Sequence, residues 1–148
     1  MPTKLEGAVL AGGRPFTYSP PELRENKHAV FLARTDHLLA TVQVLREGGE
    51  NNLHSHPHQD GFWMVLSGAV RFYGENDAVI AELGKNEGVL IPRGTKYWFE
   101  SSSSEPLEIL QVEAFAKPLR NVEDINADRV DHTPRSATGA IVHDGRWK

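Results

Sequence analysis

The stretch NLHSHPHQDGFWMVLSG, residues 52–68, carries the features that decide both the fold and the candidate site. Three of the seven histidines fall within five consecutive positions of this stretch, at His54, His56 and His58, and Asp60 follows them. Alternate side chains of a β-strand point to the same face, so an extended segment brings His54 and His56 together. The stretch therefore predicts a metal site, an acid–base site, or a degenerate form of one.

Short apolar runs rich in β-branched and aromatic residues continue on both sides of this stretch at roughly ten-residue spacings. Turn-forming residues separate them, and no long helical periodicity appears in the middle of the chain. This pattern predicts an antiparallel sandwich or barrel. The predicted strands are residues 29–34, 38–46, 62–66, 70–74, 78–83, 88–92, 96–100 and 107–115.

The composition narrows the class of protein. A chain of 148 residues is expected to form one domain with a substantial core. A net charge of -4 without a basic stripe argues against nucleic acid as a partner, and no apolar run is long enough to cross a membrane. The absence of cysteine excludes a disulfide scaffold, thiol catalysis and cysteine-bound zinc. The apolar stretch near the start, Ala8–Gly12, is too short for a signal peptide, which favours the cytoplasm.

The two ends differ in composition from the middle. We expect an N-terminal extension over residues 1–28, a barrel over 29–116 and a C-terminal extension over 117–148. Residues 121–130 form a possible helix, with Asn121 as its cap and Asp124 at the third helical position. Ile141, Val142 and Trp147 are expected to pack on the barrel or on a partner subunit.

The histidine stretch resembles the first signature motif of the cupin superfamily. In that motif a glycine stands five residues before His-x-His, a glutamate follows after three or four residues, and a glycine closes the motif. Here Gly48 precedes His54 at that distance, His56 follows, and Gly68 is the closing glycine.

A second stretch, NEGVLIPRGTKYWFES at residues 86–101, resembles the second cupin motif through Pro92 and Gly94. Together the two motifs cover about residues 38–115. The resemblance implies a small, single-domain, RmlC-like cupin: an all-β, antiparallel jelly-roll β-barrel with short N- and C-terminal extensions. It also implies a divalent metal held inside the barrel by three histidines and one glutamate.

The sequence departs from the cupin pattern at two of the four ligand positions. Counted back from Gly68, the family's glutamate falls on Gly61, which has no side chain. Asp60 lies at the shorter permitted spacing from His56, and a bulge would turn it inward. In the second motif Tyr97 replaces the histidine.

The first interpretation keeps the metal. His54, His56 and Asp60 form a two-histidine, one-carboxylate set in this interpretation, and Tyr97 is a fourth ligand or contacts the ligands. Fe, Mn, Ni and Zn all suit such ligands, and the chemistry expected is that of a dioxygenase or an isomerase. His58 and Gln59 are alternatives to Asp60 as the oxygen or nitrogen ligand.

Two other interpretations drop the metal. In one, His56 or His54 and Tyr97 form an acid–base pair, as in metal-free sugar-nucleotide epimerases of the broader family. In the other, the barrel binds a small ligand without turnover. The candidate pocket residues are His58, Gln59, Trp63, Phe72, Arg93 and Phe99, of which Phe72 and Phe99 suit the core better than the pocket.

The favoured hypothesis is a metal-dependent cupin that acts on a small organic or carbohydrate-derived molecule. Small cupins pair as dimers, so a homodimer is expected, with the exposed edge of a sheet covered by the second copy. The sequence leaves the substrate and the reaction open, because cupins include several kinds of enzyme as well as storage proteins.

Overall fold

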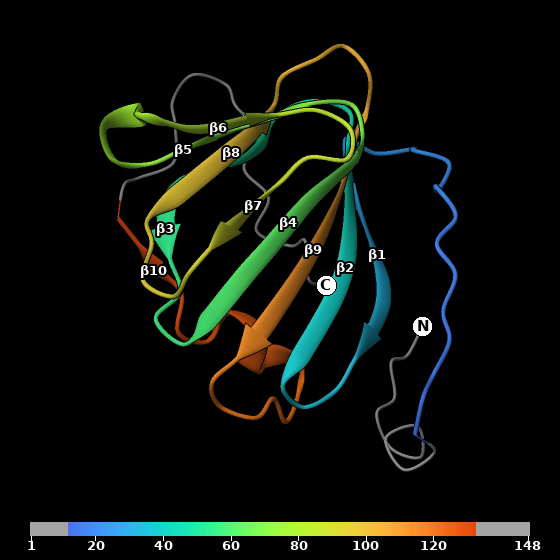
Figure 1. Cartoon of the computed structure of the whole chain (residues 1–148), viewed down its shortest axis with the longest axis vertical. Helices are drawn as coiled ribbons and strands as arrows, with labels where there is room; N and C mark the ends of the chain where they lie inside the picture. The colour runs from blue at the N-terminus through green and yellow to red at the C-terminus, as the bar shows by residue number, and fades with distance from the viewer. Residues whose placement is uncertain (1–11, 133–148) are drawn as a thin grey trace.

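The computed structural model describes residues 12–132 and arranges them as two antiparallel sheets packed face to face (Figure 1). One sheet has the strand order β1-β2-β9-β4-β7 and the other has the order β10-β3-β8-β5-β6. The predicted all-β, jelly-roll architecture is confirmed.

The strand bounds agree with the predicted runs within a few residues. The strands are β1 Lys27–Arg34, β2 Leu38–Leu45, β3 Gly49–Ser55, β4 Gln59–Ser67, β5 Val70–Tyr73, β6 Val79–Leu83, β7 Gly88–Ile91, β8 Tyr97–Ser101, β9 Leu107–Phe115 and β10 Val130–Asp131. Two of them, β3 and β10, are absent from the predicted set. Strand β3 carries His54 and few apolar residues, so periodicity alone did not reveal it.

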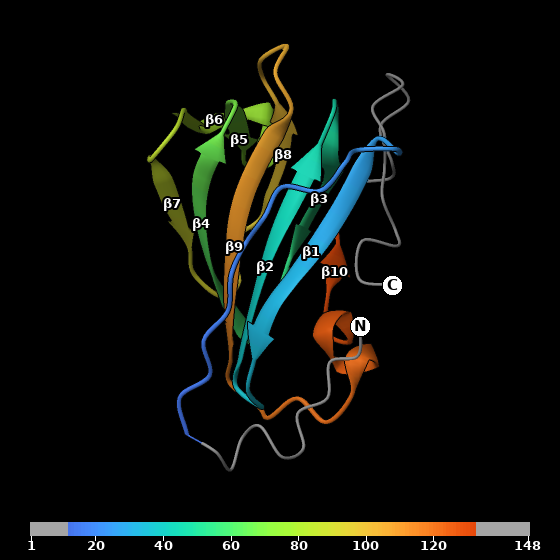
Figure 2. The ribbon, with the colours of Figure 1, turned by 90° about the vertical axis from the view of Figure 1, so that its right-hand side faces the viewer.

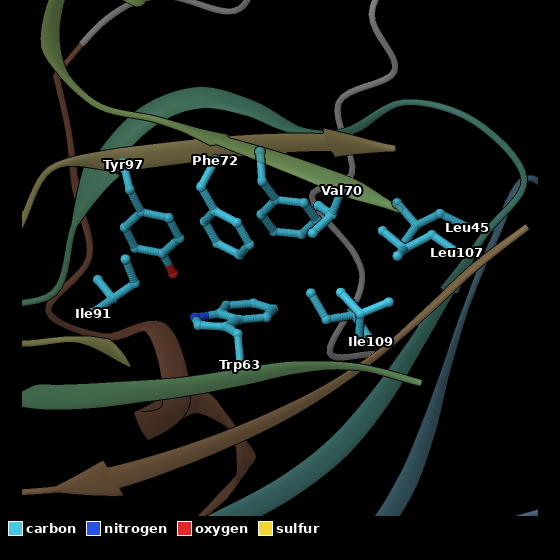
Figure 3. Packing of buried hydrophobic residues seen from close by; sticks show 10 residues of the cluster. Leu45, Trp63, Val70, Phe72, Ile91, Tyr97, Leu107 and Ile109 are labelled. Atoms are coloured by element: carbon cyan, nitrogen blue, oxygen red, sulfur yellow. The ribbon is translucent and has the colours of Figure 1, made fainter. Parts of the chain in front are cut away.

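The apolar core fills one half of the space between the sheets. Trp63 reaches from β4 toward Phe72 and Tyr97 on the facing sheet, with ring centroids 5.6 and 6.2 Å away (Figure 3). The ring of Phe99 on the same sheet lies 5.1 Å from Trp63. Such tilted and edge-on aromatic contacts are favourable beyond the area they bury. Trp63, Phe72 and Phe99 are completely buried, so these three residues belong to the core.

The turn between β7 and β8 depends on one glycine. Gly94 has a φ of 82°, a conformation that side chains with a Cβ rarely adopt, and its N–H donates to the carbonyl oxygen of His56. The Pro-x-Gly sequence therefore ties this turn to the segment that follows β3, next to the histidines.

The described part of the C-terminal extension closes one end of the sandwich (Figure 2). Leu119 and Ile125 are buried with Leu39 and Phe115 in a second apolar cluster. The helical element is a 3-10 helix, η3 (Val122–Asn126), shorter than the predicted helix, and Asn121 and Asp124 form the capping box at its start. The prediction for Ile141, Val142 and Trp147 lies outside the described residues.

The described part of the N-terminal extension, which starts at residue 12, runs along the outer face of the sheet that contains β1, β2 and β9 (Figure 2). Its Tyr18 hydroxyl donates to Glu108 on β9 at 2.7 Å, and Arg14 donates to the carbonyl oxygen of Arg34. Within residues 12–132 no helix has the length and apolar character that crossing a membrane requires.

Candidate functional site

A layer of buried polar side chains lies between the two apolar clusters. On β9 the inward residues change from Leu107 and Ile109 to Gln111 and Glu113, and then back to Phe115. The neighbouring strands add polar side chains next to these two. Thr41 on β2 is the cross-strand partner of Gln111, and Gln43 on β2 donates to Gln111 Oε1 at 2.7 Å. Gln59 on β4 donates to Glu113. The layer contains Thr41, Gln43, His54, His56, Gln59, Gln111 and Glu113, all buried. Burying this many polar groups costs free energy, which makes the layer the candidate site.

Glu113 supplies a carboxyl group where the resemblance had implied a glutamate at Gly61. Gly61 and Glu113 are direct cross-strand partners in the pairing of β4 with β9. Both residues line a small cavity of about 10 Å³, here called the inner cavity. The other residues around it include His56, Gln59, Ile91 and Tyr97. Glu113 is not among the site residues predicted from the sequence.

The contacts of Glu113 leave one of its oxygens available. Gln59 Nε2 donates to Oε2 at 2.5 Å, whereas Oε1 is buried without a hydrogen-bond partner among the described residues. Glu113 is only 2% exposed, and this burial raises its pKa from 4.5 to about 8 against the opposing effect of the Gln59 hydrogen bond. At neutral pH the group is therefore mostly a neutral carboxylic acid.

His54 and His56 lie side by side at the end of β3, with ring centroids 5.2 Å apart. His54 Nδ1–H donates to the carbonyl oxygen of Asn52 at 2.8 Å, so Nε2 is its unprotonated nitrogen. His56 lines the inner cavity, and neither of its ring nitrogens has a partner among the described residues. Burial lowers the pKa of both histidines to about 3, so both are neutral at pH 7.

Tyr97 completes the group around the inner cavity. It is the cross-strand partner of His54 on β8, and their rings are 4.4 Å apart. Its hydroxyl points into the space between the sheets (Figure 3). Burial, and then the nearby Glu113, raise the pKa of Tyr97, so its hydroxyl keeps its proton. The structure thus brings together His54, His56, Gln59 and Tyr97, as the sequence predicted for a common site.

Asp60 lies apart from the histidines. Its neighbours Gln59 and Gly61 face the interior, so strand alternation directs Asp60 to the outer face of β4. There Asp60 Oδ1 accepts a hydrogen bond from the backbone N–H of Arg93 at 2.8 Å and pairs with the Arg93 side chain at 3.4 Å. No bulge turns it inward, so the arrangement that the metal interpretation required of Asp60 is not present, and Arg93 points away from the pocket with it.

His58 lies outside the inner cavity. Its ring contacts Asp128 at 3.0 Å and its side chain is 48% exposed. His58 and Gln59 line a second, larger cavity of about 490 Å³, here called the outer cavity. Gln59 borders both cavities, so it forms the wall between them.

The described residues do not fit the metal centre that the cupin resemblance implies. Within residues 12–132 no three His, Asp or Glu side chains are arranged to hold a metal ion. Asp60 faces outward, Gly61 has no ligand atom, and a tyrosine stands in the place of the third histidine. The donors that do converge are two neutral imidazoles, a phenol and a protonated carboxyl, which suit proton transfer better than metal binding.

Comparison with known proteins agrees with the fold. The family model described as a cupin domain matches residues 41–113. No curated protein matches the chain. A Klebsiella pneumoniae protein with a double-stranded β-helix domain superposes with a TM-score of 0.61 at 22% identity, covering 82% of this chain and 99% of that one.

Two further solved structures are similar. Streptomyces PAC13, solved with uridine as a His-to-Gln variant, has a TM-score of 0.61 and 14% identity over 86% of this chain and 98% of that one. An RmlC-like cupin from Desulfovibrio desulfuricans has a TM-score of 0.52 and 19% identity over 66% of this chain and 96% of that one. At these identities the similarity establishes the fold and leaves the reaction to the site itself.

Proposed function

Because this chain belongs to the cupin superfamily, we propose that it uses the barrel for metal-independent proton transfer on a small organic or carbohydrate-derived molecule. His56, Tyr97 and Glu113 are the residues that act on the reacting atoms. The observation that carries the proposal is the cross-strand pair of Gly61 and Glu113, which places a buried carboxyl group with an unpartnered oxygen beside His56 and Tyr97.

The three groups have complementary roles at neutral pH. Glu113 holds a proton and can donate it, while the neutral imidazole of His56 can accept one. The raised pKa of Glu113 and the lowered pKa of His56 leave the carboxyl protonated and the imidazole unprotonated at the same pH. Tyr97 keeps its hydroxyl proton and hydrogen-bonds the substrate oxygen.

The reaction supported by this arrangement is isomerisation next to a carbonyl group. His56 removes the proton from the carbon beside the carbonyl, and the electron pair of the broken C–H bond forms a carbon–carbon double bond. The carbonyl oxygen takes the proton of Glu113, which gives an enol and a carboxylate. Return of a proton to carbon and of the enol proton to Glu113 yields the isomer and restores the site.

The size of the inner cavity limits what enters it. A space of about 10 Å³ holds about one water molecule, so it accepts the carbonyl oxygen, with the reacting carbon at its mouth beside His56, and not a whole substrate. The body of the molecule must lie outside, past Gln59. The PAC13 structures were solved with uridine, which makes uridine and its oxidised derivatives the first compounds to test.

The test is hydrogen exchange in deuterated water. The full chain, dialysed against a chelator, is incubated with a panel of uridine derivatives, keto acids and sugars, and deuterium uptake beside the carbonyl is followed by NMR. We expect exchange that survives chelation and falls at least about 100-fold in His56→Gln, Tyr97→Phe and Glu113→Gln. The exposed Glu105→Gln is the matched control.

The metal-dependent alternative predicts a different result. In that case plasma mass spectrometry finds stoichiometric Fe, Mn, Ni or Zn in the wild type and none in the His54→Ala, His56→Ala variant. Chelation then abolishes exchange, and this outcome would contradict the metal-independent proposal.

A further inference from the structure

The outer cavity is large enough to hold a small molecule and opens next to the candidate site. We propose that it binds a small organic anion, a carboxylate or a phosphate monoester with a short apolar body. This deepens the proposed function, on which it rests, by naming the substrate class of that site. Its volume of about 490 Å³ lies within the range typical of ligand pockets.

The apolar part of the cavity fits the body of such a ligand. Phe115, from the end of β9, and Leu119 are both buried residues of the second apolar cluster that also line the cavity. Because these side chains are held in place by packing against Leu39 and Ile125, the wall exists before any ligand binds. A preformed apolar wall reduces the entropy lost on binding.

The charges around the cavity favour an anion. Lys117 and Arg120 are exposed, and neither side chain makes an ion pair within residues 12–132. The two carboxylates are already engaged. Asp124 Oδ2 accepts the backbone N–H groups of Arg120 and Asn121 at 2.8 and 3.2 Å.

The second carboxylate is engaged in the same way. Asp128 Oδ2 accepts the backbone N–H of His58 at 3.1 Å and contacts His58 Nδ1 at 3.0 Å. One oxygen of each carboxylate thus already accepts hydrogen bonds from the protein, whereas the cations of Lys117 and Arg120 are available to pair with an anionic ligand.

Gln59 links this cavity to the reacting groups. It lines the outer cavity and also donates to Glu113 in the inner cavity. A ligand whose charged end lies near Arg120 and whose other end contacts Gln59 is therefore one side chain away from Glu113, and Gln59 is the residue it must displace to reach the carboxyl.

The test uses three small probes of similar shape on the full chain: phenyl phosphate, benzoate and the neutral benzyl alcohol. Binding is measured by ligand-observed NMR and calorimetry. We expect both anions to bind at least about tenfold more tightly than benzyl alcohol. Tighter binding of phenyl phosphate than of benzoate identifies a phosphate monoester as the preferred anion, and the reverse identifies a carboxylate.

Variants assign the binding to the cavity. The double substitution Lys117→Gln, Arg120→Gln removes exposed charges and is expected to weaken anion binding at least about tenfold, with Lys85→Gln as the exposed control. Three results would overturn the inference. Benzyl alcohol binds as tightly as the anions, or the double variant binds the anions as tightly as the wild type, or no probe binds at millimolar concentration.

The failure of this inference is separable from the failure of the proposed function. Glu113→Gln is expected to keep anion binding while losing hydrogen exchange. Anion binding that depends on Lys117 and Arg120, without exchange in any compound, would refute proton transfer and leave the anion site standing. Hydrogen exchange that is unchanged in the Lys117→Gln, Arg120→Gln variant would refute the anion site as the substrate site and leave proton transfer standing.

Discussion

The buried carboxyl of Glu113 makes the stability of this protein depend on pH in a window that can be calculated. Its pKa is 4.5 in the unfolded chain and about 8 in the folded protein. Between these values the folded protein holds one proton more than the unfolded chain. By linkage, the contribution of Glu113 to stability is fully present below pH 4.5 and is lost as the pH rises through 8.

The two buried histidines set the pH range in which the contribution of Glu113 can be measured without theirs. His54 and His56 have pKa values lowered from 6.5 to about 3, so the unfolded chain binds more protons than the folded protein in that range. Their contribution is therefore lost as the pH falls below 6.5, opposite in sign to that of Glu113. Above about pH 7.5 these two histidines are neutral in both states and Glu113 remains, and the comparison with Glu113→Gln removes their contribution below that pH.

The expected size of the effect follows from integrating the proton difference. From pH 6.5 to about pH 9 the free energy of unfolding falls by about 2 kcal/mol on account of Glu113. For a chain of this length that corresponds to a loss of about 4–8 °C in melting temperature. Glu113→Gln removes the titrating group and keeps an amide oxygen that can accept the Gln59 hydrogen bond, so its stability should not show this loss.

The assay is urea unfolding, followed by tryptophan fluorescence, at a series of pH values for the wild type, Glu113→Gln and Glu105→Gln. Glu105 is exposed and stands just before β9, so its variant controls for the loss of one carboxyl group. The difference between wild type and Glu113→Gln should grow by about 2 kcal/mol across the window. Parallel profiles would refute the reasoning and with it the role of Glu113 as a proton donor.

Four further predictions follow from particular contacts. Tyr97→Phe should reduce hydrogen exchange at least about 100-fold while leaving the fold intact by circular dichroism, because the ring stays in the core. Gly88→Ala should cost more than about 3 kcal/mol in urea unfolding, since its Cβ would lie 2.2 Å from the backbone oxygen of Trp63. Gly61→Ala should cost about 1 kcal/mol, since the nearest atom to its Cβ would be the side-chain Nε1 of Trp63 at 3.0 Å. Asp60→Asn should lower stability by less than about 1 kcal/mol and leave exchange unchanged, because the ion pair it breaks is exposed. Light scattering is expected to give the mass of a homodimer at micromolar concentration, and a monomer mass would contradict that prediction.

Much of the fold and part of the site could be predicted from local patterns. Alternation and turn residues located most of the strands, because a strand half-buried in a sandwich must place apolar side chains at every second position. The spacing of His54 and His56 predicted their convergence for the same reason. The positions of Gln59 and Tyr97 relative to the two motifs placed them at the same site.

Asp60 and Glu113 show where local patterns stop being informative. Asp60 stands at a permitted motif spacing, but spacing counts residues and does not say which face of β4 each one occupies. Glu113 stands in LEILQVEAF, where alternation puts Gln111 and Glu113 on the same face as Leu107 and Ile109. A polar pair on an otherwise apolar face is the signal that could have identified it.

The sequence by itself determined most of the strands, the turns between them and the pair of histidines, since these depend on residues close together in the chain. Only the tertiary structure decided which carboxyl group completes the site. Strands β4 and β9 are far apart in the sequence, and their hydrogen-bond register alone places Glu113 opposite Gly61. A shift of one residue in that register would turn Glu113 to the other face, so its role depends on long-range pairing that no local motif encodes.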